Sequence, residues 1–197
     1  MTDLEPDDFA PSLAATGTAA REEVVLLDDA GRPVGTADKA LVHGADTPLH
    51  QAFSCHVFDR AGRVLVTRRA LTKLTWPGVW TNSFCGHPAP GERVEDALAR
   101  RGRFELGIDV THPAVVLPEF RYRAVDASGV VENEICPVYA ARFDGELAAE
   151  PDEVAEYRWV SPQDLLTAVR AAPFTFSPWL VLQLADQRLA RLFGRHG

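Results

Sequence analysis

Residues 86–108, GHPAPGERVEDALARRGRFELGI, give the strongest indication of the fold. A loop rich in glycine and proline leads into 92–106, where helix-forming residues predominate, and Gly107 supplies a typical helix stop. We therefore expect a helix over 92–106. Just before it, the segment 80–88, WTNSFCGHP, places Cys85 two residues before His87 on irregular backbone. A thiol and an imidazole in that setting indicate a reactive site.

The sequence on both sides of this region has strand and helix patterns. Six segments read as strands, two pairs of them joined by hairpin turns: 23–27, 51–58 with 63–67, 120–125 with 130–143, and 157–160. Ser161 and Ser177, each followed by proline, are typical caps for helices over 162–171 and 178–193. We expect an α+β fold in which a mixed β-sheet is covered by α-helices, forming one domain over 22–197 after a flexible tail at 1–21.

Composition limits the classes of function. The 197 residues are 46% hydrophobic and carry a formal net charge of −8, which argues against nucleic acid or an anionic membrane as the main partner. No apolar run approaches the roughly 20 residues of a membrane span, and the N-terminus lacks a secretory pattern. Three cysteines without framework spacing favour a reducing compartment, so a cytoplasmic protein is expected. We also expect a monomer or weak dimer that acts on a small molecule.

Five groups with metal-ligand chemistry stand out. His43 and His50 flank a loop, and Glu132 and Glu134 are two apart in a predicted strand, so the two carboxylates share one face. If these side chains and His87 converge, they suit a divalent ion such as Mn²⁺, Mg²⁺ or Zn²⁺. The alternative for each loop histidine taken singly is a solvated side chain.

Other groups have equally plain structural readings. Cys85 is as easily an inert buried thiol as a reactive one, and Trp179 is as a rule a core residue, although a helix start is a good place for an indole to enter a pocket. Cys55 and His56, adjacent on a predicted strand, are interpreted as structural.

The predicted helix region also resembles the Nudix box. Gly86, Glu92, Arg100, Glu105, Gly107 and Ile108 match the box, whereas Arg101, Gly102 and Phe104 depart from it, two of them at positions where the box has glutamates. A pyrophosphohydrolase needs those carboxylates to gather Mg²⁺ around the phosphates. The resemblance therefore implies a Nudix-like fold without Nudix hydrolysis.

Longer motifs resemble type 1 isopentenyl-diphosphate isomerases, the bacterial branch most closely. The resemblance extends from about Val24 to the last helix and rests on six segments: 67–70, 76–83, 85–88, 120–123, 132–134 and 176–179. It implies interconversion of isopentenyl and dimethylallyl diphosphate in isoprene biosynthesis, by proton addition and removal through a carbocation.

The resemblance also assigns roles to residues. Cys85 and Glu134 would carry protons on opposite faces of the substrate, Tyr122 would hydrogen-bond one of them, and Trp179 would offer its ring to the cation. The implied metal ligands are His43, His50, His87, Glu132 and Glu134. The implied diphosphate ligands are Lys39, Arg69, Lys73 and Arg101, with a second ion, Mg²⁺, bridged through Glu105.

Two other classes of function remain open from the residues alone. One is a Nudix-type hydrolase of a nucleoside or prenyl diphosphate, which the replaced carboxylates and a superfluous cysteine argue against. The other is a non-catalytic metal- or ligand-binding domain, which would leave Cys85 and Trp179 without a shared purpose. Without the resemblance, the residues support only a metal-dependent enzyme acting on a phosphorylated small molecule.

Overall fold

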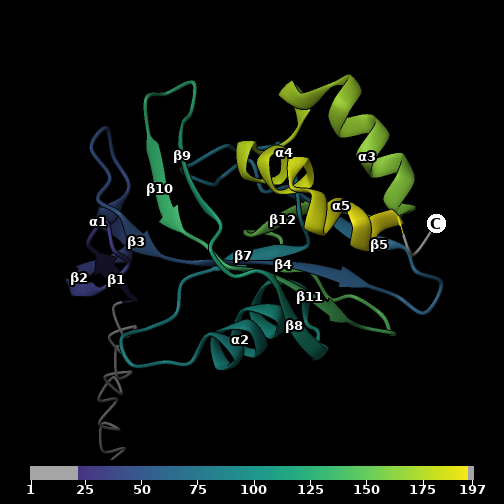
Figure 1. Ribbon diagram of the computed structural model, residues 1–197, viewed down its shortest axis with the longest axis horizontal. Helices are drawn as coiled ribbons and strands as arrows, with labels where there is room; N and C mark the ends of the chain where they lie inside the picture. Colours follow the sequence, from purple (N-terminus) through teal and green to yellow (C-terminus); the bar gives the residue numbers. More distant parts are fainter. Residues whose placement is uncertain (1–21, 195–197) are drawn as a thin grey trace, which may run out of the picture.

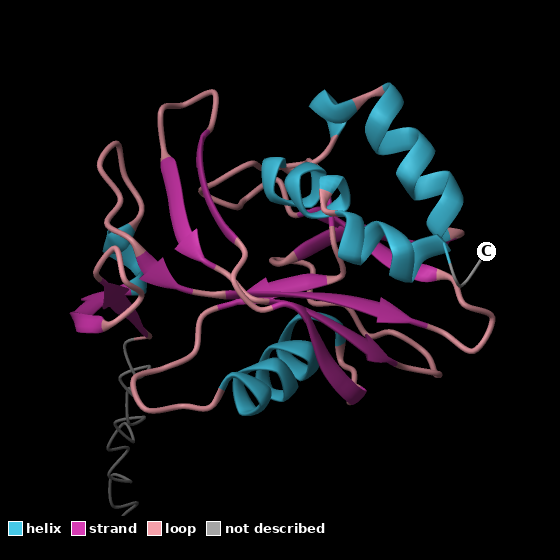
Figure 2. Ribbon diagram, in the orientation of Figure 1, coloured by secondary structure: helices cyan, strands magenta, loops and turns pink. Residues whose placement is uncertain are grey.

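The computed structural model describes residues 22–194, and the predicted tail at 1–21 lies outside them. Two β-sheets and a set of helices make up the described part (Figure 1; Figure 2). Both sheets contain parallel as well as antiparallel pairs, so they are mixed, and the predicted α+β class is confirmed. None of the helices in this part of the chain is long and apolar enough to cross a membrane.

The first sheet has the strand order β2-β1-β3-β10-β9. Its strands are β1 (Glu23–Leu27), β2 (Pro33–Asp38), β3 (His50–Gln51), β9 (Arg121–Val125) and β10 (Val131–Ile135). The second sheet has the order β12-β5-β4-β11-β8, with β6 paired to β5 and β7 paired to β4. Its strands are β4 (Phe53–Phe58), β5 (Val64–Arg69), β6 (Trp80–Thr81), β7 (Phe84–Gly86), β8 (Thr111–Leu117), β11 (Val138–Arg142) and β12 (Val154–Val160).

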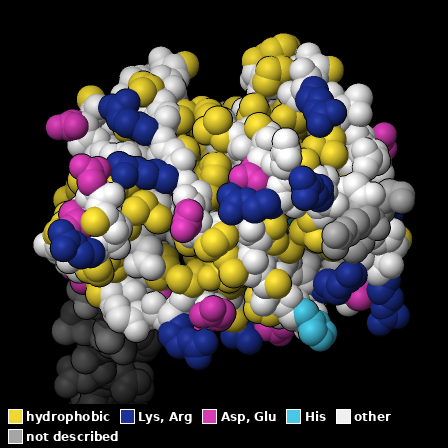
Figure 3. Space-filling model, viewed as in Figure 1, with side chains coloured by type: hydrophobic (Ala, Val, Ile, Leu, Met, Phe, Trp, Pro, Cys, Tyr) yellow, Lys and Arg dark blue, Asp and Glu magenta, His cyan; other side chains and the backbone are white. Residues whose placement is uncertain are grey.

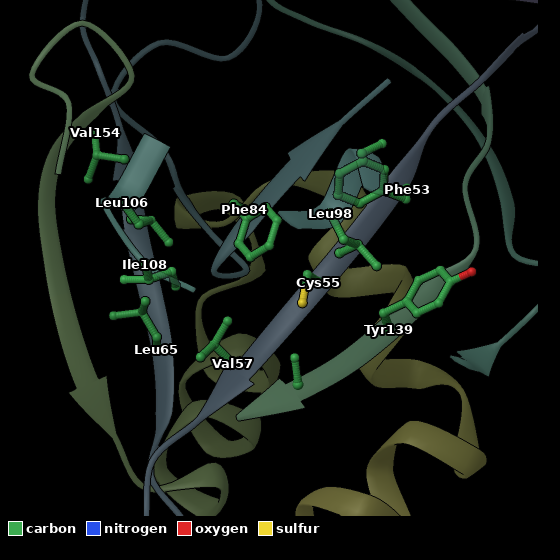
Figure 4. Close-up of a cluster of buried hydrophobic side chains, with 12 residues drawn as sticks. Phe53, Cys55, Val57, Leu65, Phe84, Leu98, Leu106, Ile108, Tyr139 and Val154 are labelled. Carbon is green, nitrogen blue, oxygen red and sulfur yellow. The ribbon is translucent and has the colours of Figure 1, made fainter. Parts of the chain in front are cut away.

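Helices cover both faces of the second sheet, as Figure 1 shows. Helix α2 (Val94–Leu106) packs on one face, where the side chains of Phe53, Cys55 and Leu65 form a buried cluster with it (Figure 4). The other face is covered by the C-terminal helices α3 (Pro162–Ala171), α4 (Pro178–Ala185) and α5 (Gln187–Gly194), with a 3₁₀ turn at Pro173–Thr175. A short helix, α1 (Lys39–Val42), follows β2.

The prediction of one strand over 130–143 is wrong. Two strands occupy that range, β10 in the first sheet and β11 in the second, and they separate at Cys136 and Pro137. Proline has no N–H to donate to a sheet ladder, which suits it to the point where the chain leaves one sheet for the other. The strand predicted over 51–58 is also two strands, β3 and β4, which separate at Ala52. In the first sheet β3 pairs with β10 in parallel, and in the second sheet β4 pairs with β11 in parallel.

The predicted hairpin 51–58 with 63–67 has its turn, but the strands pair only at Phe58 and Val64. Beyond that pair β6 and β7 enter between β5 and β4, which places Cys85 of β7 opposite Ser54 of β4. The predicted helix 178–193 is two helices, because Asp186 interrupts it and its carboxylate accepts a hydrogen bond from the backbone N–H of Arg188, as an N-cap does.

Candidate active site

A cavity of about 560 Å³ opens between the two sheets, at the place where their strands diverge. Of the residues predicted to form the site, all but the fully buried His50 line it. These lining residues are Lys39, His43, Arg69, Lys73, Cys85, His87, Arg101, Glu105, Tyr122, Glu132, Glu134 and Trp179. The cavity is therefore walled by residues from both sheets, α1, α2 and α4, which are far apart in the sequence.

One end of the cavity holds a cluster of histidines and a carboxylate. The ligand-type atoms of His43, His50, His87 and Glu134 all lie within 4.8 Å of one another. His87 Nε2 is 3.1 Å from Glu134 Oε1 and 3.2 Å from His50 Nε2. Glu134 is opposite His50 in the parallel register of β10 and β3, so strand pairing itself brings these two together.

This cluster fits a divalent metal ion. His50 Nδ1 lies 2.9 Å from the carbonyl oxygen of Pro48 and donates to it, which leaves the lone pair of Nε2 directed at the cluster. Among residues 22–194, no side-chain or backbone group makes a hydrogen bond to the buried atoms His43 Nε2 and Glu132 Oε2, which form an ion-pair contact with each other at 3.0 Å. Glu132 thus borders the cluster of four as a fifth group. Imidazole and carboxylate together are the donor set of Mn²⁺ and Zn²⁺, and also admit Mg²⁺.

Glu134 is held as a carboxylate by its neighbours. Burial by itself raises its pKa, but hydrogen bonds and charges from His50 and His87 outweigh burial and keep the pKa well below the usual value for glutamate. Burial lowers the pKa of His87 against the opposing effect of Glu134, which favours the neutral form of the ring that a metal ligand requires.

Cys85 lies beside the polar side chains of Ser54, on β4, and of Asn82, three residues earlier in its own segment. Its Sγ is 3.3 Å from Ser54 Oγ, and equally 3.3 Å from both Oδ1 and Nδ2 of Asn82. Burial raises the pKa of the thiol to about 12, against the opposing effect of hydrogen bonds from Ser54 and Asn82. Cys85 is therefore a protonated thiol in this site.

An aromatic wall adjoins the thiol. Trp179 is nearly fully buried, and its Nε1 donates to Thr81 Oγ1 at 2.9 Å and to Asn82 Oδ1 at 3.0 Å, so its orientation is fixed. The ring centroid of Tyr122 lies 5.7 Å from that of Trp179. Within the described residues no hydrogen bond joins Tyr122 to Cys85 or Glu134, although the charge of Glu134 contributes, after burial, to raising the Tyr122 pKa.

Four cationic side chains also line the cavity: Lys39, Arg69, Lys73 and Arg101. Arg101 is buried and donates to Glu105 at 2.6 Å and to Glu153 at 3.3 Å, while Lys73 forms an ion pair with Glu153. Arg69 lies over the Trp179 ring, with its Cζ 5.4 Å from the centroid. Lys39 lines the same cavity and pairs with Glu22. These cations have carboxylate or carbonyl partners that an entering anion can replace.

The Nudix-box residues that are retained have a structural use here. Arg100 donates to both carboxylate oxygens of Glu92, and its Nη2 also donates to the carbonyl oxygen of His87 at 3.1 Å. Phe104, where the box has a glutamate, is 54% exposed and does not line the cavity. The loop that carries His87 is thus tied to α2, while the acidic cluster of the box is absent.

Sequence reasoning missed several residues that complete the site. Thr75 Oγ1 donates to Glu132 Oε1 at 2.9 Å and accepts from Arg69 Nη2 at 3.0 Å. Glu153 binds two of the predicted diphosphate ligands. Ser54 and Asn82 contact the thiol. Of these residues only Asn82 lies in a motif noted in the sequence, the segment 80–88. The contacts of Ser54, Thr75 and Glu153 with the site join segments that are far apart in the sequence.

The fold and this site define a Nudix-fold protein. A model of the NUDIX domain matches residues 48–180. A solved structure of a Deinococcus radiodurans protein is similar at a TM-score of 0.61 and 20% identity, covering 88% of this chain and 98% of that one. A MutT protein from Methanosarcina mazei Go1 is similar at a TM-score of 0.54 and 19% identity, over 76% and 93% of the two chains. At these identities the likeness concerns the fold alone.

Curated relatives specify the family within that fold. The isopentenyl-diphosphate Delta-isomerase of Agromyces mediolanus is 61% identical over 93% of this chain and 89% of the relative. The enzyme of the same name from Leifsonia xyli subsp. xyli is 64% identical over 85% and 91%, and that of Citrobacter koseri 53% over 87% and 94%. The chain belongs to the isopentenyl-diphosphate Delta-isomerase family.

Proposed function

We propose that this protein interconverts isopentenyl diphosphate and dimethylallyl diphosphate, the reaction named by its relatives. The observation that carries the proposal is the content of one cavity: a half-buried thiol and a buried carboxylate together with a fixed indole, and four cationic side chains that suit a diphosphate. A hydrolase of diphosphates would need the carboxylates that Arg101 and Phe104 replace.

Cys85 and Glu134 carry the protons in this proposal. An unactivated alkene is a poor base, so its terminal carbon takes a proton only from an acid held in contact, and a tertiary carbocation results. A base then removes a proton from the neighbouring methylene group, whose C–H electron pair becomes the new double bond. The face of the Trp179 ring stabilises the transient cation, a contact worth about 2 kcal/mol when desolvated.

Two divalent ions fit the remaining groups. The first would be held by His43, His50, His87, Glu132 and Glu134, and Mn²⁺, Zn²⁺ and Mg²⁺ all suit these donors. The second, Mg²⁺, would be bridged to the diphosphate through Glu105, next to Arg101. When bound, the first ion would tune the acidity of Glu134 and the second would offset the charge of the diphosphate.

The proposal includes a small-molecule substrate, a cytoplasmic location and a small assembly. Basic and acidic side chains are interspersed on the face seen in Figure 3, in keeping with a small-molecule substrate rather than nucleic acid or a membrane surface. Three free cysteines, two of them buried, suit a cytoplasmic protein. A single domain over 22–197, as a monomer or weak dimer, completes the proposal.

Removal of a diphosphate ligand should weaken binding rather than chemistry. The diphosphate carries its charge in both the ground and the transition state, so we expect Arg69→Ala and Lys73→Ala each to raise KM about ten- to a hundredfold with little change in kcat. The matched control is Arg68→Ala, because Arg68 is adjacent but does not line the cavity. Steady-state kinetics decide the matter, and unchanged KM in both variants would assign the diphosphate to other groups.

Thr75 should support the metal site although it is no ligand. Its hydroxyl joins Glu132 to Arg69, so the isosteric variant Thr75→Val leaves Glu132 free to reorient. We expect metal affinity to fall about tenfold or more, as for other residues that orient a ligand. Isothermal titration of metal-stripped protein with Mn²⁺ measures this, with Thr36→Val on an exposed strand as the control. Equal affinities of the Thr75 variant and the parent would rule the role out.

A further inference from the structure

Three polar side chains without solvent exposure form a series that begins at Cys85, and none of the three lines the cavity. Ser54 and His56 are two apart on β4 and therefore face the same way, toward α4 and α5, and Gln183 comes from α4 to meet them. Gln183 Nε2 is 2.9 Å from Ser54 Oγ, and Gln183 Oε1 is 3.0 Å from His56 Nε2. A continuous chain of hydrogen bonds thus leads from the thiol to a buried imidazole.

The hydrogen bonds of this series all donate in one direction, from His56 toward Cys85. Burial lowers the pKa of His56 to about 4, so its ring is neutral and carries one proton. Since an amide oxygen only accepts, that proton is on Nε2 and is donated to Gln183 Oε1, while the buried Nδ1 has no hydrogen-bond partner in the described part of the chain. The amide nitrogen of Gln183 in turn donates to Ser54 Oγ. Ser54 accepts at that point, so its own hydroxyl proton is available to a sulfur.

Two sulfurs lie within reach of Ser54, Cys85 Sγ at 3.3 Å and Cys136 Sγ at 3.4 Å. If Ser54 donates to Cys85, Cys136 can donate its S–H to the remaining lone pair of Ser54 Oγ, and the hydrogen-bonding capacity of the Ser54 hydroxyl is then filled. In the reverse arrangement the thiol proton of Cys85 would point at Ser54, away from the substrate. In the first arrangement the thiol proton is not turned toward Ser54, and it lies either toward Asn82 Oδ1, 3.3 Å from the sulfur, or toward the substrate in the cavity.

We propose that Ser54 is a positioning residue for Cys85, fixed as a hydrogen-bond donor by Gln183 and His56. Its O–H occupies the side of the sulfur that faces Ser54, so the thiol proton stays available to the substrate. When that proton moves to carbon, the S–H bond breaks, the electron pair stays on sulfur, and the Ser54 O–H remains in place to stabilise it. The inference rests on the proposed role of Cys85 in isomerisation.

The test separates kcat from KM. Ser54→Ala should lower kcat about tenfold to a hundredfold with KM unchanged, since a hydrogen bond to a charged sulfur is made in the chemical step and not in substrate binding. The matched control is Ser83→Ala, because Ser83 is equally buried and hydrogen-bonded to Val57 N and Leu65 O, but does not contact the thiol. A loss of stability in both variants with a loss of kcat only in Ser54→Ala is the expected result.

A double-mutant cycle tests whether Gln183 acts on Cys85 through Ser54. Gln183→Met should lower kcat by several-fold in the parent and have no further effect in the Ser54→Ala background. Equal effects in the two backgrounds, or kcat of Ser54→Ala within about twofold of the parent, would overturn the proposal. A parent-like Ser54→Ala next to an inactive Cys85→Ala refutes only this inference, whereas an active Cys85→Ala refutes the proposed function.

The tautomer of His56 gives a readout in the unmodified protein. Nitrogen-15 spectra of the histidine rings should show His56 protonated on Nε2 alone throughout pH 6 to 9. Protonation on Nδ1 would require the Gln183 amide to be reversed, and Ser54 could then no longer be the donor to Cys85. That result would overturn the proposal even if the Ser54 variants failed to fold.

Discussion

Replacement of Cys85 by alanine should leave the protein folded and remove nearly all isomerisation. General acid–base groups contribute about a hundred- to ten-thousandfold to rates, and no other thiol lines the cavity in the described part of the chain. The loss should fall on kcat, because proton transfer to or from carbon is the step that needs the thiol. Circular dichroism and steady-state kinetics on the purified variant measure both expectations.

The matched control is Cys55→Ala. Cys55 is fully buried in the cluster between β4 and α2, on the opposite face of the strand from Ser54, so its loss should lower stability and leave most of the activity. If a thiol alkylator abolished the activity of Cys85→Ala as completely as that of the parent, the proton-carrying group would lie elsewhere.

The second large effect is expected at Glu134. Glu134→Gln keeps the shape of the side chain and removes its charge, so the cluster with His50 and His87 loses its central carboxylate. Metal content and isomerisation should fall together, the rate by about a thousandfold, because one residue is both the proposed ligand and a proposed proton carrier. Elemental analysis and kinetics on the same preparation give the two quantities.

Glu156→Gln on β12 is the control for this change, because Glu156 pairs with Arg158 and Arg68 and is not among the residues lining the cavity. A chelator should affect the parent as the substitution does, by removing both metal and activity. A chelated protein that stayed fully active without added metal would contradict the metal site as a whole.

The local patterns of the sequence were sufficient for much of the fold. The helix before Gly107 begins within two residues of the prediction and ends at Leu106 as predicted, because the glycine stop is a local signal. The change of sheet at Ala52 could not be predicted in this way, since no turn residue marks it and the partner strands lie far away in the sequence. Pro137, by contrast, is a local signal for the end of a strand that the prediction of 130–143 did not use. Strand β8 was missed because its side chains are mostly exposed and lack alternation.

The site shows the same division between local and long-range information. The motif around Cys85 and the paired glutamates was visible because the residues are neighbours in the sequence. The contacts that bring Ser54, Thr75 and Glu153 into the site are made with residues about thirty to eighty positions away in the sequence. Local patterns therefore could not reveal them. His56 was interpreted as structural, and the structure shows it buried and paired with Gln183 rather than lining the cavity.

The most direct measurement of the proposed chemistry is incubation with isopentenyl diphosphate and Mg²⁺ in deuterated water. Protonation of the terminal alkene carbon predicts dimethylallyl diphosphate with solvent deuterium in a methyl group, and prolonged incubation should exchange further positions as the reaction reverses. The Cys85→Ala variant should give nearly none of this product. Release of phosphate without labelled dimethylallyl diphosphate would contradict isomerisation and indicate a diphosphate hydrolase instead.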